Sequence, residues 1–191
     1  EQTPQPIAQC YSAVEMPSKL STLSAKDNRL QILSDRIRMM QDQTALFDGN
    51  IEILYRDTML NAVNAQVSQK DQTLVASGGI QYYSQDLKVS SSQFSAQLKE
   101  DKAVLNDADY QLVSQSGRGY AKEMSAYKQQ INLTEASFTT CPDGDNGWAL
   151  EAEDIQLNAD DGWGEAWNSV VKIKGVPVLY LPYMTFPVSN Q

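Results

Sequence analysis

The chain has 191 residues, 41% hydrophobic and 20% charged, so it is long enough to bury a substantial core and is not a disordered tail. Lys and Arg number 15 against 24 Asp and Glu, and the net charge of −9 argues against nucleic acid or an anionic membrane surface as the main partner. Histidine is absent, which excludes Ser-His-Asp triads, Cys-His dyads and imidazole metal sites. An enzyme would have to use carboxylate, Lys, Tyr or Ser-Lys chemistry. We expect no enzyme, no cofactor and no metal ion. No apolar run approaches the roughly 18 residues of a spanning helix, and we recognise no signal peptide.

The first two thirds of the chain show the pattern of an all-β fold. Residues 1–20 contain three prolines without hydrophobic periodicity, which predicts an extended N-terminal arm. From about residue 30 to 138, apolar and polar residues alternate, as in strands with one buried face. A helix over 26–43 competes with strands, and the alternation favours strands. Turn residues at 48–50, 77–79 and 116–119 predict breaks between strands.

An internal repeat supports this interpretation. Residues 47–67 align with residues 77–97, so that Ile51 matches Ile80 and Asp57 matches Asp86, and a weaker third copy begins near Ala103. Each copy predicts a hairpin with a tight turn at the aspartate. Because an isolated hairpin is only marginally stable, the copies must stack into a continuous sheet, as in a sandwich, a jelly roll or a solenoid.

The last third is richer in Gly, Pro and Trp. Pro177, Pro182 and Pro187 interrupt an apolar run over 172–187. Because proline cannot donate to a strand ladder, this run is predicted to be an edge strand or a connector. The chain ends while it is still apolar, so we expect a longer protein.

Several side chains suggest alternative functions. Asp143, Asp145 and Glu151 offer oxygen ligands in the style of a calcium loop, although a simple turn explains the string as well. The acidic cluster at 151–154 offers carboxylates for glycoside hydrolysis. Trp148, Trp163 and Trp167 could form a platform on which sugars stack, as in a β-sandwich that binds polysaccharide. Tryptophans also commonly cover the open end of a hydrophobic core.

The two cysteines, Cys10 and Cys141, are far apart in the chain. They can pair with each other, act as bystanders, or bond to cysteines outside this chain, and spacing does not choose among these.

Two strings carry a family resemblance. ASFTTCPDGDNGWALEAEDIQLN (136–158) and GWGEAWNSVVKIKGVPVLYLPYMTFP (162–187) resemble the junction segment of the LptD family of outer-membrane lipopolysaccharide-assembly proteins. The preceding repeats resemble the OstA-like periplasmic domain that this family shares with the soluble LptA family. The resemblance implies a twisted β jelly roll of antiparallel hairpins, with an open hydrophobic slot for lipid acyl chains between two sheets. It implies an OstA-like jelly roll over 21–160, followed over 161–191 by the last strands and a connector toward a membrane β-barrel.

The resemblance also implies partners and a location. These are lipopolysaccharide, a soluble OstA-like bridge protein of the LptA type that docks by adding a strand, the chain's own C-terminal barrel, and a plug lipoprotein of the LptE type. The implied location is the periplasmic face of the Gram-negative outer membrane. Cys10 and Cys141 match family cysteines that are disulfide-bonded to cysteines of the barrel.

The resemblance and the alternation together predict the site residues. The docking edge is expected to contain Leu30, Ile32, Ile37 and Met39. Because the ligand's headgroup and the protein are both anionic, we expect the acyl chains to supply the binding energy. The slot is predicted to be lined by Ile51, Ile53, Leu60, Ile80, Tyr82, Leu87, Val89, Tyr110, Leu112, Ile131 and Leu133.

Overall fold

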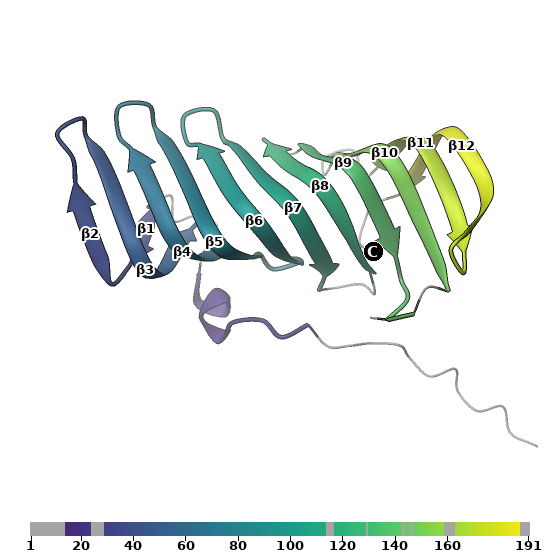
Figure 1. Cartoon of the computed structure of the whole chain (residues 1–191), viewed down its shortest axis with the longest axis horizontal. Coiled ribbons are helices and arrows are strands. Elements are labelled where there is room, and N and C mark those ends of the chain that lie inside the picture. The colour runs from purple at the N-terminus through teal and green to yellow at the C-terminus, as the bar shows by residue number, and fades with distance from the viewer. Residues whose placement is uncertain are drawn as a thin grey trace, which may run out of the picture.

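The computed structural model describes residues 14–23, 29–113, 117–128, 130–142, 144–145, 147–158 and 163–187 (Figure 1). Its strands form one antiparallel sheet in the order β1-β3-β4-β5-β6-β7-β8-β9-β10-β11-β12, with β2 also paired to β3. No helix in this described part is long and apolar enough to cross a membrane. The elements are the 3-10 helix η1 (Ser18–Thr22) and the strands β1 (Gln31–Leu33), β2 (Arg36–Met39), β3 (Thr44–Tyr55), β4 (Thr58–Ser68), β5 (Thr73–Tyr83), β6 (Leu87–Gln97), β7 (Lys102–Leu112), β8 (Gly117–Tyr127), β9 (Gln130–Thr139), β10 (Trp148–Asn158), β11 (Trp163–Ile173) and β12 (Val176–Pro187).

The all-β jelly-roll prediction is confirmed, and so is its organisation into hairpins. β3 and β4 form the first predicted hairpin, β5 and β6 the second, and β7 and β8 the third. The segment over 26–43 contains strands β1 and β2 rather than a helix within its described residues. The proline-interrupted run is β12, an edge strand, as its missing backbone donors predicted.

The glycine-containing breaks at 48–50 and 77–79 are not turns, and that prediction is wrong. Gly49 and Asn50 lie inside β3, and Gly78 and Gly79 inside β5, all with positive φ where the strand register shifts. A β-bulge places an extra residue in left-handed backbone, so it selects the same residue types as a hairpin turn. Gly117 and Gly119 likewise lie within β8.

Left-handed residues recur in the middle of every second strand, and in β3 and β5 they come with a register shift. Asp107 in β7, Glu135 in β9 and Asn168 in β11 also have positive φ in the middle of their strands. A left-handed residue, with or without a bulge, bends its strand, and such residues aligned across a sheet bend the whole sheet along one line. Each copy of the internal sequence repeat therefore also contains a bend at the same position of its first strand.

The sheet is folded lengthwise along this line of left-handed residues into a trough. The turns β2–β3, β4–β5, β6–β7 and β8–β9 form one rim, here called the Asp101 rim, and the turns β3–β4 and β5–β6 form the opposite Arg56 rim. An 11-residue strand extends about 35 Å, so these rims would be far apart in a flat sheet. Instead, Nη1 of Arg56 and Oδ2 of Asp101 are 3.8 Å apart. The two layers expected for the jelly roll are thus two walls of one continuous sheet.

Small residues occupy the crease between the walls. Several alanines beside the bulges are buried, and Ala108 and Ala121 have no exposed surface. Large side chains would hold the walls apart at this position, so alanine allows the sharp fold. The crease set on the inner face is Ala62, Ala108, Ala121, Ala136 and Ala152, with Ser169 continuing it into β11.

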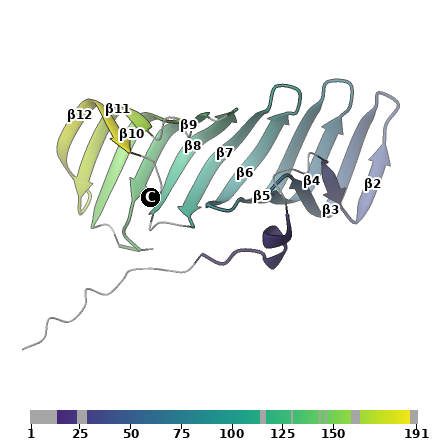
Figure 2. The ribbon, with the colours of Figure 1, turned by 180° about the vertical axis from the view of Figure 1, so that it is seen from behind.

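The described end of the N-terminal arm is not extended. η1 follows Pro17, and its buried Leu20 packs with Leu54 and Met59 in a small cluster. Lys19 of η1 also forms an ion pair with Glu52. The arm therefore closes over the outer face of the trough near β3 and β4, where it is visible from behind in Figure 2.

Candidate functional site

The predicted slot residues share the inner face of the trough. Strand register aligns Ile53, Leu60, Tyr82, Val89 and Tyr110 in one row across β3–β7. Ile51 and Ile80 continue this face toward the crease. The apolar alternation therefore selected one physical surface, as it must when each strand buries a single face.

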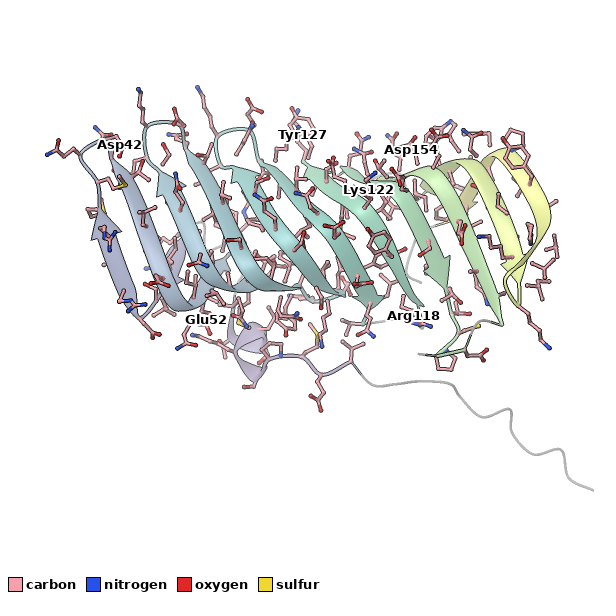
Figure 3. All side chains as sticks on the ribbon, viewed as in Figure 1. Asp42, Glu52, Arg118, Lys122, Tyr127 and Asp154 are labelled. Carbon is pink, nitrogen blue, oxygen red and sulfur yellow. The ribbon has the colours of Figure 1, made fainter. Side chains whose placement is uncertain are left out.

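The remaining predicted residues complete the two walls. Leu87 and Leu112 are paired on the Arg56 wall, whereas Ile131 and Leu133 lie on the Asp101 wall. Figure 3 labels Arg118 and Tyr127 near the two ends of β8, which lead to the two rims. Leu133 is buried, and Leu87, Leu112 and Ile131 are half-buried.

The opposite wall also contains a row that the sequence analysis did not single out. It follows Ala76, Phe94, Leu105 and Met124 across β5–β8 and continues through Leu133 to β12. These residues belong to the same core cluster as the predicted set. The same alternation identifies these residues if the inward-facing positions are shifted by one residue after the left-handed residue in the middle of each strand.

A cavity of 260 Å³ lies between the two walls. Leu60 and Tyr82 line it from the Arg56 wall, and Leu74, Phe94 and Ala103 line it from the Asp101 wall. An engineered apolar cavity of about 150 Å³ already binds benzene, so this space is large enough for a short apolar chain. The cavity has room for one short acyl chain, and several chains require the walls to separate.

Two tyrosines place hydroxyl groups among these apolar residues. The Tyr110 hydroxyl donates to the Ser137 carbonyl oxygen at 2.8 Å, and burial raises the pKa of Tyr110 well above its usual value. Burial, with a smaller contribution from the charge of Asp57, raises the pKa of Tyr82 to about 12. Both phenols are neutral at physiological pH, so they add no charge to the inner face.

The predicted docking residues divide into two groups. Leu30 and Ile32 are partly buried and pack against the core cluster. Ile37 and Met39 lie in β2, where they pair with Phe47 and Ala45 on the inner face, and they are 61% and 59% exposed. β2 pairs only with β3 among the described strands, so its other backbone edge is unpaired.

The residues of the alternative functions do not converge on a site. Trp148 packs edge-on against Phe138 on the inner face, whereas Trp163 and Trp167 lie on the outer face. The three tryptophans therefore do not form one platform for sugar stacking.

The acidic cluster is engaged in side-chain pairs. Lys172 bonds to Glu151 at 2.6 Å, Asn168 donates to Glu153 at 2.5 Å, and Thr134 donates to Asp154 at 3.4 Å. Cross-strand polar pairs of this kind are typical of the solvated face of a sheet.

The calcium-like string and the cysteines are only partly within the described residues, since Asp143 and Cys10 lie outside them. Asp145 accepts a hydrogen bond from the Gly147 amide at 2.9 Å, as in a local turn. Cys141 is half-buried in the β9–β10 connection and forms no disulfide with another described residue.

The chain is similar to known proteins along its whole length. A family model described as "LptA/(LptD N-terminal domain) LPS transport protein" matches residues 31–163. "LPS-assembly protein LptD" of Shewanella denitrificans is 34% identical over 100% of this chain and 26% of that protein. The same-named protein of Pseudoalteromonas translucida is 35% identical over 85% of this chain and 22% of its own. The chain thus spans about a quarter of these relatives.

One solved structure shares the fold. It is the crystal structure of LptH from Pseudomonas aeruginosa, described as the LptA homologous periplasmic component of the lipopolysaccharide transport device. The TM-score is 0.50 at 13% identity, over 58% of this chain and 85% of LptH. At this identity the likeness concerns the fold alone.

Proposed function

The chain belongs to the LptA/LptD N-terminal domain family of lipopolysaccharide transport proteins, and from this premise we propose that it carries lipopolysaccharide through its trough. The acyl chains lie between the walls while the saccharide stays outside the rims. The chain receives lipopolysaccharide from a soluble bridge protein of the LptA type and passes it toward an outer-membrane barrel. It does so by binding and release, without catalysis.

The observation that carries this proposal is an apolar inner face that is continuous from β2 to β12. Each row crosses many strands without a charged residue, and the two tyrosines on it are neutral. Each buried methylene contributes about 0.8 kcal/mol, so a lengthwise apolar surface can hold acyl chains at successive, nearly equivalent positions. Because the binding free energy is nearly equal at neighbouring positions, an acyl chain can move between them without being trapped at one.

The open side of the trough supports placing the saccharide outside. The rims carry polar and charged groups, including Arg56, Asp101, Lys102 and Lys128 beside the cavity. A headgroup can remain hydrated there while its chains are buried.

The ends of the sheet supply the routes in and out. Among the described strands β2 leaves one backbone edge unpaired, and the bridge protein adds a strand to this edge and delivers lipid at this end. The relatives are about four times longer than this chain. The chain passes lipopolysaccharide on at its β12 end, toward the outer-membrane barrel and a separate plug lipoprotein of the LptE type. The resulting position is the periplasmic face of the outer membrane.

Photocrosslinking tests the proposal. We expect a benzophenone side chain at Tyr82 or Leu87 to form adducts with lipopolysaccharide in living cells, because both residues are half-buried on the inner face. The matched control is the same probe at Lys88, the next residue along β6, which faces outward. Adducts at Lys88 equal to those at Leu87, or none at either inner position, would contradict a lipid-filled trough.

A competition experiment identifies the part of the ligand that binds. Unlabelled lipopolysaccharide should suppress the adduct at Tyr82, and the delipidated core saccharide should not. Equal suppression by the saccharide would instead favour polysaccharide binding.

A further inference from the structure

We infer that β2 is a charge-selective docking strand whose partner is an amphipathic β-strand with an acidic residue opposite Arg38. The partner strand belongs to the soluble OstA-like bridge protein, so this inference rests on the proposed function and specifies its docking surface.

β2 presents two chemically different faces. Ile37 and Met39 lie on the inner face, paired with Phe47 and Ala45, whereas Arg36 and Arg38 lie on the outer face. All four residues of β2 are exposed. Because side chains alternate across a sheet, an added strand must place apolar residues beside Ile37 and Met39 and polar residues beside the arginines.

The two arginines differ in what they already contact. Arg36 bonds to Asp48 on β3 at 2.6 Å, so its charge is compensated within the chain. The row that contains Arg38 continues through Leu46, Gln66 and Val75, none of which is acidic. Arg38 has no ion pair with any described residue.

The chain carries a net charge of −9, yet its open edge presents an uncompensated cation. A hollow of 580 Å³ lies beside that cation and gives room for incoming side chains; besides Arg38 its lining includes Leu46, Val75 and the paired Arg36 and Asp48. A neutral or basic strand would leave Arg38 unpaired or repelled, whereas an acidic residue at that register completes the row.

The test measures binding of the purified bridge protein from the same bacterium to this chain. Arg38→Glu should weaken binding about tenfold or more, because it places like charges side by side. Lys99→Glu is the matched control, since it makes the same charge change at the exposed β6–β7 turn and should leave the affinity within about twofold. Replacing the acidic residue opposite Arg38 with Lys on the partner should restore binding to Arg38→Glu.

Salt provides a second measurement that needs no variant. Between about 0.1 M and 1 M NaCl the Debye length falls from about 10 Å to about 3 Å, so wild-type affinity should fall and the Arg38→Glu defect should shrink. This inference is overturned if the affinity changes neither with the salt concentration nor with Arg38→Glu. Ile37→Pro distinguishes strand addition from charge selection, because it removes a backbone hydrogen-bond donor from the edge strand. If Ile37→Pro abolishes docking while Arg38→Glu does not, strand addition stands and charge selection fails; if neither matters, docking at β2 fails.

Discussion

At the scale of single residues, the inner face depends on one close contact between a tyrosine and a glycine. Tyr110 on β7 pairs with Gly119 on β8, and a Cβ at Gly119 would lie 2.6 Å from the Tyr110 hydroxyl and 1.8 Å from the Ser137 carbonyl oxygen. The ring therefore lies across the glycine, and its hydroxyl reaches the Ser137 carbonyl on β9. Glycine here makes room for an aromatic that helps to join three strands.

We predict that Gly119→Ala destabilises the domain by about 3 kcal/mol or more, because backbone or ring must move to admit the methyl group. Gly175→Ala is the control: a Cβ there meets nothing within 4 Å, although φ is +79°. That variant should lose only about 1 kcal/mol from the left-handed backbone. Urea unfolding measures both, and equal losses would contradict the steric explanation.

The two inner-face tyrosines predict a loss of stability at alkaline pH. Their pKa values are raised by burial, so folding favours the neutral phenols, and this contribution is complete below the usual pKa of about 10. It is lost as pH rises from about 10 through the raised value, which is about 12 for Tyr82. The variant Tyr82→Phe/Tyr110→Phe should lose less stability over that range than the wild type in urea titrations. Tyr127→Phe, at an exposed tyrosine, should behave as the wild type does.

At the scale of the strand, the bulge determines the architecture. Gly78 in β5 has φ +87°, and a Cβ there would lie 2.7 Å from Cβ of Val63 on the neighbouring strand. The bulge thus needs glycine for its backbone angle and for the approach of β4. Without the bulge, β5 would stay straight and its two halves could not belong to opposite walls.

We predict that Gly78→Ala lowers the free energy of unfolding by about 2–4 kcal/mol, through backbone strain and overpacking together. This loss is larger than that expected for an alanine with positive φ alone. Val63→Gly in the same chain should recover part of that loss, because it removes the Val63 Cβ and methyl group that the new Cβ meets. Thermal unfolding of the single and double variants measures the coupling. Strictly additive effects would show that Val63 is not the cause.

The bulges also explain which features the sequence could reveal. Alternation identified strands and one face of each, so Ile53, Tyr82 and Val89 were correctly grouped. It could not distinguish Gly78–Gly79 in a bulge from the same residues in a turn, since both require positive φ. Phe94 and its row were left out for this reason: the opposite wall is visible only once the bend is known.

At the scale of the whole molecule, the trough is closed more tightly than its proposed cargo requires. The cavity of 260 Å³ has room for only part of the proposed cargo, so we expect the walls to separate on loading. Arg56 and Asp101 connect the rims across this opening, with side chains that are 40% and 55% exposed. An exposed ion pair contributes about 1 kcal/mol at most, so it holds the rims together only weakly.

Preventing the rims from separating should therefore block loading without affecting docking at β2. In a Cys10→Ser/Cys141→Ser background, we predict that a short bis-maleimide linking Arg56→Cys to Asp101→Cys abolishes the lipopolysaccharide adduct at Tyr82, while the affinity for the bridge protein stays unchanged. The Arg56→Cys single variant treated with the same reagent controls for modification of one rim and should retain the adduct. Because the linked residues lie outside the inner rows, the apolar surface itself is unaltered. If the linked protein still forms the Tyr82 adduct at wild-type yield, lipid enters without separation of the walls, and entry must occur lengthwise through the ends of the trough.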